Sequence, residues 1–337
     1  ARTGFGTDLL RGGFWHSEKR IDCRRATAKK LGVMSRLRID VIAPPFQGHL
    51  HPILGLADVL REFADVRVLT MPDGEGSVAA GGFEYIPLLE RHRAEVWRIA
   101  STPRPVRGRP WMLLRQFREN LALLPSLNRE VEAAWSVRRP DIALVDFTLP
   151  TIGHLARASG IRWWTSHPSP LAIETWDGTP AYLGGWSHPT TAAGRLRDAL
   201  GRGCVRTFKR LMFFAFNREL QRLGLERLYW PDGYEAVYSN EVILALGVRE
   251  LELPRSWPAA VRFVGPVCRT WSGSAAEKPV LDARRKNILV TIGTHLPHAR
   301  RRMLAHLEAL AAAMPDLFFH YTTGGSDTES GAGGSNW

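Results

Sequence analysis

Cysteine is scarce in this sequence, and its placement argues against two classes of small, cross-linked domain. Three of the 337 residues are cysteines, Cys23, Cys204 and Cys268, and they lie far apart without a Cys-x-x-Cys pair. A disulfide framework uses an even number of regularly spaced cysteines, and a zinc knuckle uses closely spaced pairs. We therefore expect three reduced thiols.

Long hydrophobic runs are also lacking. No stretch approaches the roughly 18 apolar residues of a membrane-spanning helix, and the first part of the chain has no apolar segment typical of a secretory signal peptide. We therefore expect a cytoplasmic protein. The length of 337 residues and the 45% content of hydrophobic residues are sufficient for a full core and suggest two domains.

Several catalytic motifs are missing as well. No GxGxxG follows the first predicted strand, and the sequence contains no GxxxxGK[ST], GxSxG or HExxH. These absences argue against a dehydrogenase, a P-loop nucleotidase and a hydrolase. His49 and His51 lie two residues apart, but no third ligand is placed beside them, so we expect no metal site.

Positive charge is abundant but unevenly placed. The net charge is +12, and residues 1–38 hold ten Lys/Arg against three Asp/Glu, so +7 of it belongs to this leading segment. Further basic clusters lie at 284–286 and 300–302. No aromatic residues are interleaved with them as in nucleic-acid-binding stripes, so we expect no nucleic-acid partner. Polyanion binding through 1–38 and 284–302, with steep salt dependence, stays open as an alternative.

The order of predicted elements indicates an α/β fold. Residues 1–33 are rich in Arg, Lys and Gly without an apolar period, so we expect a basic, disordered extension there and take Met34 as a candidate start. An apolar run predicts a buried strand at 38–43, a helix beginning near Pro52, and a second strand at 65–70.

The same alternation returns further along the chain. A long helix is predicted at 111–135, a strand at 141–146, a helix at 150–159 and a strand at 161–165. Strands that alternate with helices predict a mostly parallel sheet covered on both faces. We therefore expect a Rossmann-like, doubly wound domain over residues 34–267.

The last part of that domain is less regular. An amphipathic helix is predicted near 207–223, and we assign its apolar face to the core. A strand at 261–264 precedes a polar segment, which predicts a linker at 268–285.

A second β-α-β unit follows the linker, with a strand at 287–292, a helix at 297–314 and a strand at 316–321. We take 286–321 as the opening unit of a second Rossmann-like domain, and 322–337 as a disordered Gly/Ser-rich tail. Because a single unit cannot bury both of its faces, we expect exposed apolar side chains. They are Leu304, Leu307, Leu310 and Phe318.

The loop after the first strand is a candidate site. Ligands of open α/β sheets bind at the carboxyl ends of the strands, and His49 lies in this loop at 44–52. The positive end of the following helix favours neutral imidazole, which can act as a general base. Packing at the helix start is the alternative role for His49.

Asp146 is a candidate partner for His49. It ends the strand 141–146 at the same sheet edge and could orient the imidazole ring of His49, or could cap the next helix instead.

Residues 44–52 read PPFQGHLHP. This segment resembles the opening motif of the UDP-glycosyltransferase superfamily, which includes plant, macrolide and carotenoid glycosyltransferases of the GT-B fold. The resemblance implies that His49 is the catalytic base and that Asp146, which follows Ala-Leu-Val, is its orienting carboxylate. It also implies an acceptor-side loop with Phe46, Gln47 and Gly48, and we add His167 from the later loop to this set.

The resemblance continues into the second domain. The segment at 253–266 is similar to the end of the family's N-terminal domain, and LVTIGT at 289–294 resembles the first strand of its donor-binding domain. A turn at a helix start can bind an anion, so Gly293 and Thr294 are candidate donor-phosphate residues. An ordinary strand-to-helix turn is the alternative for this segment. The family's later His-x-Gly-Gly donor block has no counterpart before Trp337.

The resemblance therefore implies inverting transfer of a sugar from a UDP- or dTDP-sugar to a hydroxyl group of a small lipophilic acceptor. The donor is a substrate, and no cofactor or metal is expected. Because the donor block is missing, a non-catalytic remnant that binds an acceptor or a partner is the alternative. The twelve tryptophans are assigned to packing.

Overall fold

The structure is a computed structural model of the chain. It describes residues 36–100, 110–168, 170–181, 183, 185–267, 281–291 and 297–322. The expected extension at 1–33, most of the linker and nearly all of the tail lie outside these ranges. In the part of the chain that is described, no helix is both long and apolar enough to cross a membrane.

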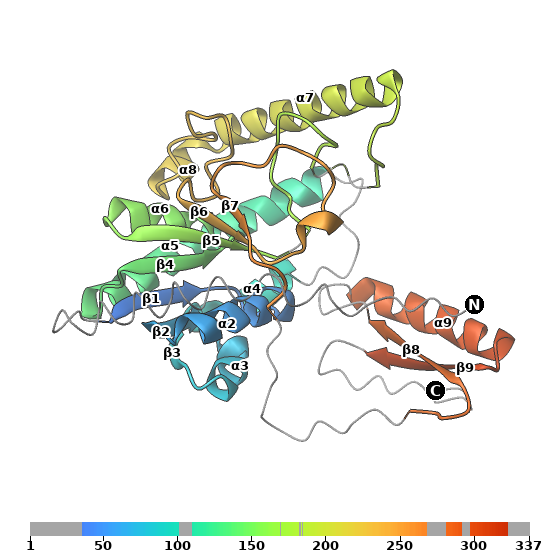
Figure 1. Cartoon of the computed structure of the whole chain (residues 1–337). Coiled ribbons are helices and arrows are strands. Elements are labelled where there is room, and N and C mark those ends of the chain that lie inside the picture. The colour runs from blue at the N-terminus through green and yellow to red at the C-terminus, as the bar shows by residue number, and fades with distance from the viewer. Residues whose placement is uncertain are drawn as a thin grey trace, which may run out of the picture. The chain divides into compact units, whose positions relative to one another are not determined.

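A seven-stranded sheet forms the centre of the larger part of the molecule (Figure 1). Every neighbouring pair with a recorded register is parallel, and the strand order is β3-β2-β1-β4-β5-β6-β7. The strands are β1 Leu37–Ile42, β2 Ala64–Thr70, β3 Glu84–Pro87, β4 Ile142–Asp146, β5 Arg162–His167, β6 Val242–Ala245 and β7 Val261–Phe263. This arrangement confirms the predicted α/β class with a doubly wound parallel sheet.

Helices connect these strands. They are α2 Gln47–Leu60, α3 Glu75–Ala80, α4 Arg93–Ala100, α5 Pro110–Val137, α6 Pro150–Ala158, α7 Ala192–Ala215 and α8 Asn217–Arg222. The predicted long helix at 111–135 corresponds to α5, and the predicted strands at 38–43 and 141–146 match β1 and β4 within a residue or two. The sequence missed β3 and β6, which have four residues each and no clear alternation.

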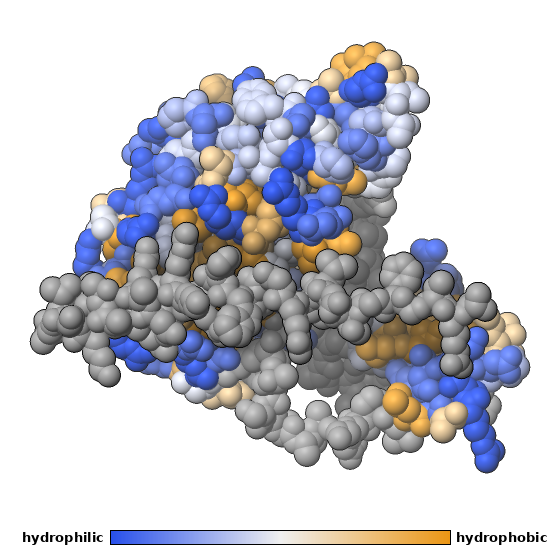
Figure 2. Space-filling view, viewed as in Figure 1, coloured by the Kyte–Doolittle hydropathy of each residue, from blue (hydrophilic) through white to orange (hydrophobic). Residues whose placement is uncertain are grey.

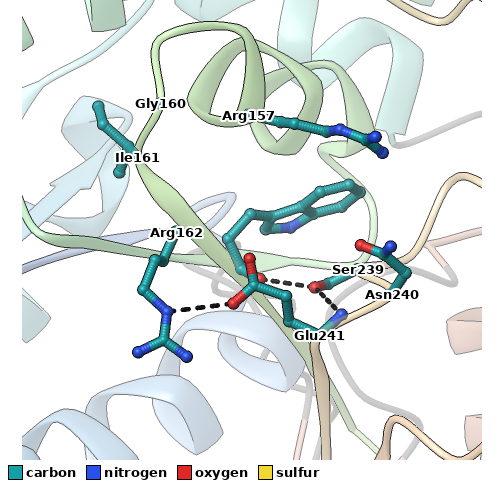
Figure 3. A pocket seen from close by; sticks show the side chains of 8 residues that line it. Arg157, Gly160, Ile161, Arg162, Ser239, Asn240 and Glu241 are labelled. Atoms are coloured by element: carbon teal, nitrogen blue, oxygen red, sulfur yellow. Dashed lines mark hydrogen bonds and ion pairs between the residues drawn. The ribbon is translucent and has the colours of Figure 1, made fainter.

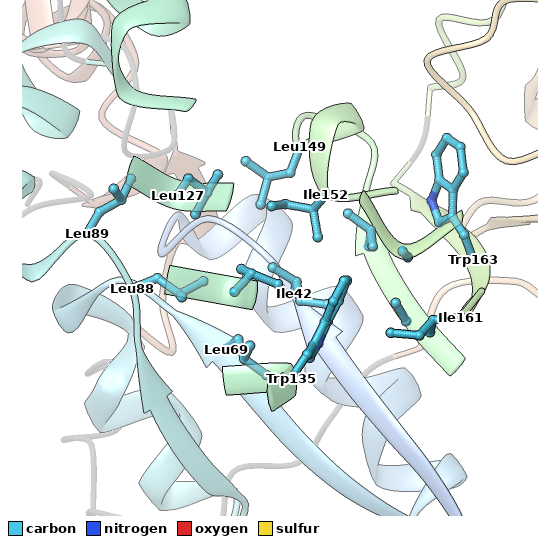
Figure 4. Packing of buried hydrophobic residues seen from close by; sticks show 14 of the residues in the cluster. Ile42, Leu69, Leu88, Leu89, Leu127, Trp135, Leu149, Ile152, Ile161 and Trp163 are labelled. Atoms are coloured by element: carbon cyan, nitrogen blue, oxygen red, sulfur yellow. The ribbon is translucent and has the colours of Figure 1, made fainter. Parts of the chain in front are cut away.

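Both faces of the sheet are buried, as the apolar strands require. On one face Ile42 and Val145 join a cluster with Leu127 and Trp135 of α5 and Ile152 of α6 (Figure 4). The adjacent strand residues point to the opposite face. There Val41 and Leu144 pack with apolar residues of α2 and α3, namely Leu50, Ile53, Leu54 and Val78.

A buried ion pair links three elements. The guanidinium of Arg67 on β2 donates two hydrogen bonds to the Asp40 carboxylate on β1, at 2.9 and 2.7 Å, and the Trp135 indole of α5 donates a third at 3.0 Å. Burial raises the pKa of Asp40, although the hydrogen bonds from Arg67 and Trp135 oppose the rise.

A separate two-stranded parallel sheet lies near the end of the chain. It consists of β8 Lys286–Thr291 and β9 Leu317–Thr322, joined by α9 Pro297–Ala313. Leu307 and Ala311 of α9 and Phe319 of β9 form its small core. The expectation that Leu307 would be exposed is therefore wrong, because the helix turns this residue onto its own sheet. Leu310, on another side of α9, is exposed as expected.

Candidate active site

Helix α2 begins earlier than the sequence indicated. Its N-cap is Phe46, and the first helical residue is Gln47 rather than a residue near Pro52. Pro52 lies inside the helix, which tolerates it near the amino end at the loss of one backbone hydrogen bond. His49 is consequently the third residue of α2, fixed in the first turn rather than in a free loop. Its backbone N–H donates to the carbonyl of Phe46 at 2.9 Å.

Asp146 is the last residue of β4, next to β1 in the sheet. The strand order reverses between β1 and β4, and such a switch point opens a crevice at the carboxyl ends of the strands. The carboxylate of Asp146 is buried and accepts hydrogen bonds from the backbone N–H and the hydroxyl of Thr148, at 3.0 and 2.6 Å. Thr148 was not identified from the sequence, although an Asp-x-Thr turn is a recognisable local pattern.

His49 and Asp146 are in contact. Nδ1 of His49 lies 3.2 Å from both carboxylate oxygens of Asp146. The His49 side chain is 22% exposed, whereas that of Asp146 is fully buried. A proton on Nδ1 that is donated to the carboxylate leaves Nε2 as the acceptor nitrogen of a neutral ring, and the carboxylate stabilises the ring once Nε2 takes up a proton.

The ring of His49 is the first of three stacked aromatic rings. The ring of Phe147 lies 5.5 Å from that of His49 and 4.0 Å from that of His167, with interplanar angles of 23° and 17°. Nδ1 of His167 donates to the carbonyl of Pro168 at 2.7 Å, and burial lowers the pKa of His167. These contacts hold the ring of His167 in one tautomer, and burial favours its neutral form.

The placement of His167 differs from the expected one. It is the last residue of β5 and is buried under Phe147, and it does not line the cavity beside His49. Loop signals such as the following Pro168 obscured the strand end, because His and Ser are unusual in a buried strand.

A cavity of about 330 Å³ opens beside His49. Phe46 and His49 line one part of it, and Thr148 and Leu149 line another. The remaining wall is mostly apolar and comes largely from α4 and α5, with contributions from Val96, Ile99, Ala100, Leu123, Leu124 and Leu127 and the amides of Gln116 and Asn120. Gln47 and Gly48 are exposed at the start of α2 and do not line the cavity. The sequence predicted α5 but gave no sign of which face would form this wall.

A second cavity, of about 260 Å³, lies at the opposite ends of the strands (Figure 3). Its charged side chains already have partners. Arg162 pairs with Glu241 at 3.1 Å, and the guanidinium of Arg157 lies over the Trp230 ring at 4.7 Å. Ser239 bonds to the carbonyl of Trp163. These groups stabilise the strand ends and leave no group suited to acid–base chemistry.

The other sequence candidates are placed as follows. Nε2 of His51 lies 3.3 Å from the hydroxyl of Ser77 in α3, and burial lowers the pKa of His51. Within the described ranges, no three His, Cys, Asp or Glu side chains are grouped so that they could hold a metal ion. Gly293 and Thr294, the candidate donor-phosphate residues, lie outside the described residues.

Comparisons with known proteins address the fold. The chain matches no protein-family model and no curated protein. Among solved structures it is similar to the glycotransferase of kitacinnamycin, with 22% sequence identity and a TM-score of 0.58, over 90% of this chain and 70% of that one. The glycosyltransferase SnogD from Streptomyces nogalater aligns with 19% identity and a TM-score of 0.49, over 87% of this chain and 69% of that one. The first of these likenesses shows that the chain has a GT-B-like glycosyltransferase fold.

Proposed function

We propose that the protein is a glycosyltransferase of the natural-product type, which transfers a hexose from a nucleotide-diphosphate sugar to a hydroxyl group of a small lipophilic acceptor. The contact between Asp146 and His49, which lines a mostly apolar cavity, is the observation that carries this proposal. The fold shared with a solved glycosyltransferase supports it.

In the proposed reaction the acceptor binds in the cavity with its hydroxyl beside Nε2 of His49. Nε2 takes the hydroxyl proton while the oxygen forms a bond to the anomeric carbon of the sugar. The bond between that carbon and the diphosphate oxygen breaks, and the nucleotide diphosphate leaves with the electron pair. Attack from the side opposite the leaving group inverts the configuration. Asp146 stabilises the imidazolium ion that forms.

We assign residues 34–267 to acceptor binding, 268–285 to the linker and 286–321 to the opening of the donor-binding domain. Gly293 and Thr294 would contact the donor diphosphate through backbone N–H groups and a hydroxyl. The cavity is built entirely from residues of the acceptor part, so acceptor binding does not require the donor domain. This observation keeps a non-catalytic, acceptor-binding role as the second candidate function.

The test separates transfer from binding. The full chain is incubated with UDP-glucose or dTDP-glucose and a panel of small phenols and alcohols, and hexosides are detected by mass spectrometry. We expect His49→Ala to lower transfer by about 100-fold or more, since a general base contributes at least that much. Acceptor affinity, measured by calorimetry, should change little. Transfer that survives in His49→Ala would contradict the proposed mechanism.

A separate substitution tests whether the acceptor binds in this cavity. Ala100 lines the cavity, and Ala100→Phe should fill it and weaken acceptor binding by about tenfold or more, because the lost contacts are apolar. Ala122→Phe, on an exposed position of α5, is the matched control. Acceptor binding without any transfer would favour the non-catalytic role, and equal binding by the two phenylalanine variants would place the acceptor elsewhere.

A further inference from the structure

Helix α7 is oriented with its charged side inward. Arg206 pairs with Glu174 at 3.1 Å, and Lys209 pairs with Glu174 at 2.6 Å and also with Glu235. Arg197 donates to the carbonyl of Ser187 at 2.9 Å. Arg206 and Lys209 therefore hold one side of the helix against the body of the protein, and Arg197 ties the opposite flank to Ser187.

The outward side of α7 is apolar. Leu196, Leu200, Phe208, Leu211 and Phe214 are all between 57% and 83% exposed. At 100° per residue these five positions fall within about 120° of the helix circumference, so they form one stripe along the helix. Figure 2 shows hydrophobic side chains at the end of α7 that stands at the upper right of the view. This polarity is opposite to that of an ordinary surface helix, whose apolar stripe faces the core.

The sequence predicted an amphipathic helix near 207–223 with its apolar face in the core, and the structure confirms this only in part. Phe216 and Leu220, beyond the end of α7, are buried with α5 residues as predicted. Phe208, Leu211 and Phe214 are exposed, because ion pairs rather than apolar contacts fix which side of α7 faces inward.

The charge on the exposed side is all of one sign. Arg210 is exposed beside the stripe, and Arg195 is exposed on the flank of the helix that also carries Arg206. Neither arginine pairs with a carboxylate in the described part of the chain. Asp198 is the only acidic residue of α7, and it is buried and paired with Arg197 at 2.7 Å. The surface thus combines large apolar side chains with unneutralised positive charge.

These features select among the possible occupants. If a second copy packed its apolar stripe antiparallel against this one about Gly203, Arg210 of each copy would have no carboxylate of either α7 beside it, because Asp198 is buried and paired with Arg197. A parallel pair would place like residues together. An anionic lipid surface meets both requirements, because its acyl region accepts Phe and Leu side chains and its headgroups attract arginine.

We propose that α7 is a peripheral membrane-binding helix that lies in the surface of an anionic lipid bilayer. Its 24 residues span about 36 Å, and the helix lies parallel to the membrane plane with the apolar stripe among the upper acyl chains. The inward ion pairs keep the helix attached to the protein while the stripe is inserted. This proposal is independent of glycosyl transfer.

The test uses the full chain and two kinds of vesicle, pure phosphatidylcholine and phosphatidylcholine mixed with phosphatidylserine. We expect sedimentation with the anionic vesicles and much weaker sedimentation with the neutral ones. The triple variant Phe208→Gln, Leu211→Gln, Phe214→Gln should reduce affinity by about 100-fold or more, since each lost apolar side chain contributes roughly a factor of ten or more. The double variant Arg195→Glu, Arg210→Glu should lose about tenfold or more and with it the preference for anionic lipid.

Val137→Gln is the matched control, because Val137 is an equally exposed apolar residue on α5. It should bind like the wild type, and circular dichroism should show all variants folded. Absence of binding to anionic vesicles, or equal binding by the triple variant, would overturn the proposal. A wild-type dimer that becomes a monomer in the triple variant, measured by sedimentation velocity, would assign the stripe to a second copy instead.

Discussion

At the scale of single residues, the candidate site contains two side chains that the sequence singled out and others that it did not. His49 follows one apolar strand and Asp146 ends another, and parallel strands bring their carboxyl ends together. Their match to the family motif added the roles that we expect for them. Thr148 and Phe147, which fix the carboxylate and the ring, carry no comparable signal. Their roles depend on the local turn, and the base function of His49 stays a prediction.

Gly153 is a position at which any side chain larger than hydrogen would clash with a neighbouring ring. It lies in α6, and a methyl group added there would be 2.0 Å from the ring of the buried Trp163. Gly153→Ala should therefore lower the free energy of unfolding by about 1–3 kcal/mol or more. Chemical denaturation would measure this loss.

Gly203 provides the matched comparison within α7, since no atom lies within 4 Å of a methyl group added there. Gly203→Ala should stabilise the protein by about 0.4–1 kcal/mol, because alanine reduces the entropy of the unfolded chain. Similar effects of the two alanines would mean that Trp163 does not pack on α6 as described.

At the scale of elements, the Asp40–Arg67 pair joins β1 to β2 and, through Trp135, to α5. Asp40→Asn would leave the buried guanidinium of Arg67 without its carboxylate, and such a loss costs about 3–5 kcal/mol. The double variant Asp40→Leu, Arg67→Met removes both charges and should cost less, about 1–3 kcal/mol for the unsatisfied Trp135 indole. Urea unfolding of the three proteins would check this order. A double variant less stable than Asp40→Asn would show that the pair is not buried as a unit.

The elements also show where sequence reasoning succeeds and where it stops. The strands β1, β4 and β5 were predicted because a buried parallel strand is a continuous apolar run. Helix α7 has an equally clear helical period, yet its apolar side faces outward, because the orientation of a helix is decided by its partners, here Glu174 and Glu235. The cavity wall of α4 and α5 was unpredictable for the same reason. The sequence predicts that a helix has an apolar side, but tertiary packing decides whether that side faces the core, a cavity or solvent.

At the scale of the whole molecule, buried histidines make stability depend on pH. His154 lies between the rings of Trp163 and Trp230, and burial lowers its pKa below 6.5. The unfolded chain therefore takes up a proton here before the folded chain does, so the free energy of unfolding should fall as the pH drops below about 6.5. His167, whose pKa is also lowered by burial, acts in the same direction.

A substitution of His154 isolates its contribution to the pH dependence of the free energy of unfolding. Buried acids such as Glu235 change this free energy in the opposite direction at lower pH, because burial raises the pKa of Glu235. His154→Gln can still donate to the carbonyl of Ala236 but cannot titrate. Urea unfolding between about pH 7 and pH 5 should show a shallower loss of stability in this variant than in the wild type. Equal slopes would show that His154 titrates normally in the folded protein.

The pairing of β1 with β4 has a consequence during synthesis on the ribosome. Both β2 and β3 leave the ribosome soon after β1, so one edge of β1 is paired early. The other edge waits for β4, roughly one hundred residues later, which is about 5–20 s at the usual rates of translation. Throughout that interval the nascent chain presents an open, apolar strand edge, which is a template for misassembly with neighbouring chains. The same event that closes this edge brings Asp146 to His49, so the newly made protein loses this open strand edge at the moment when it gains its histidine–aspartate pair.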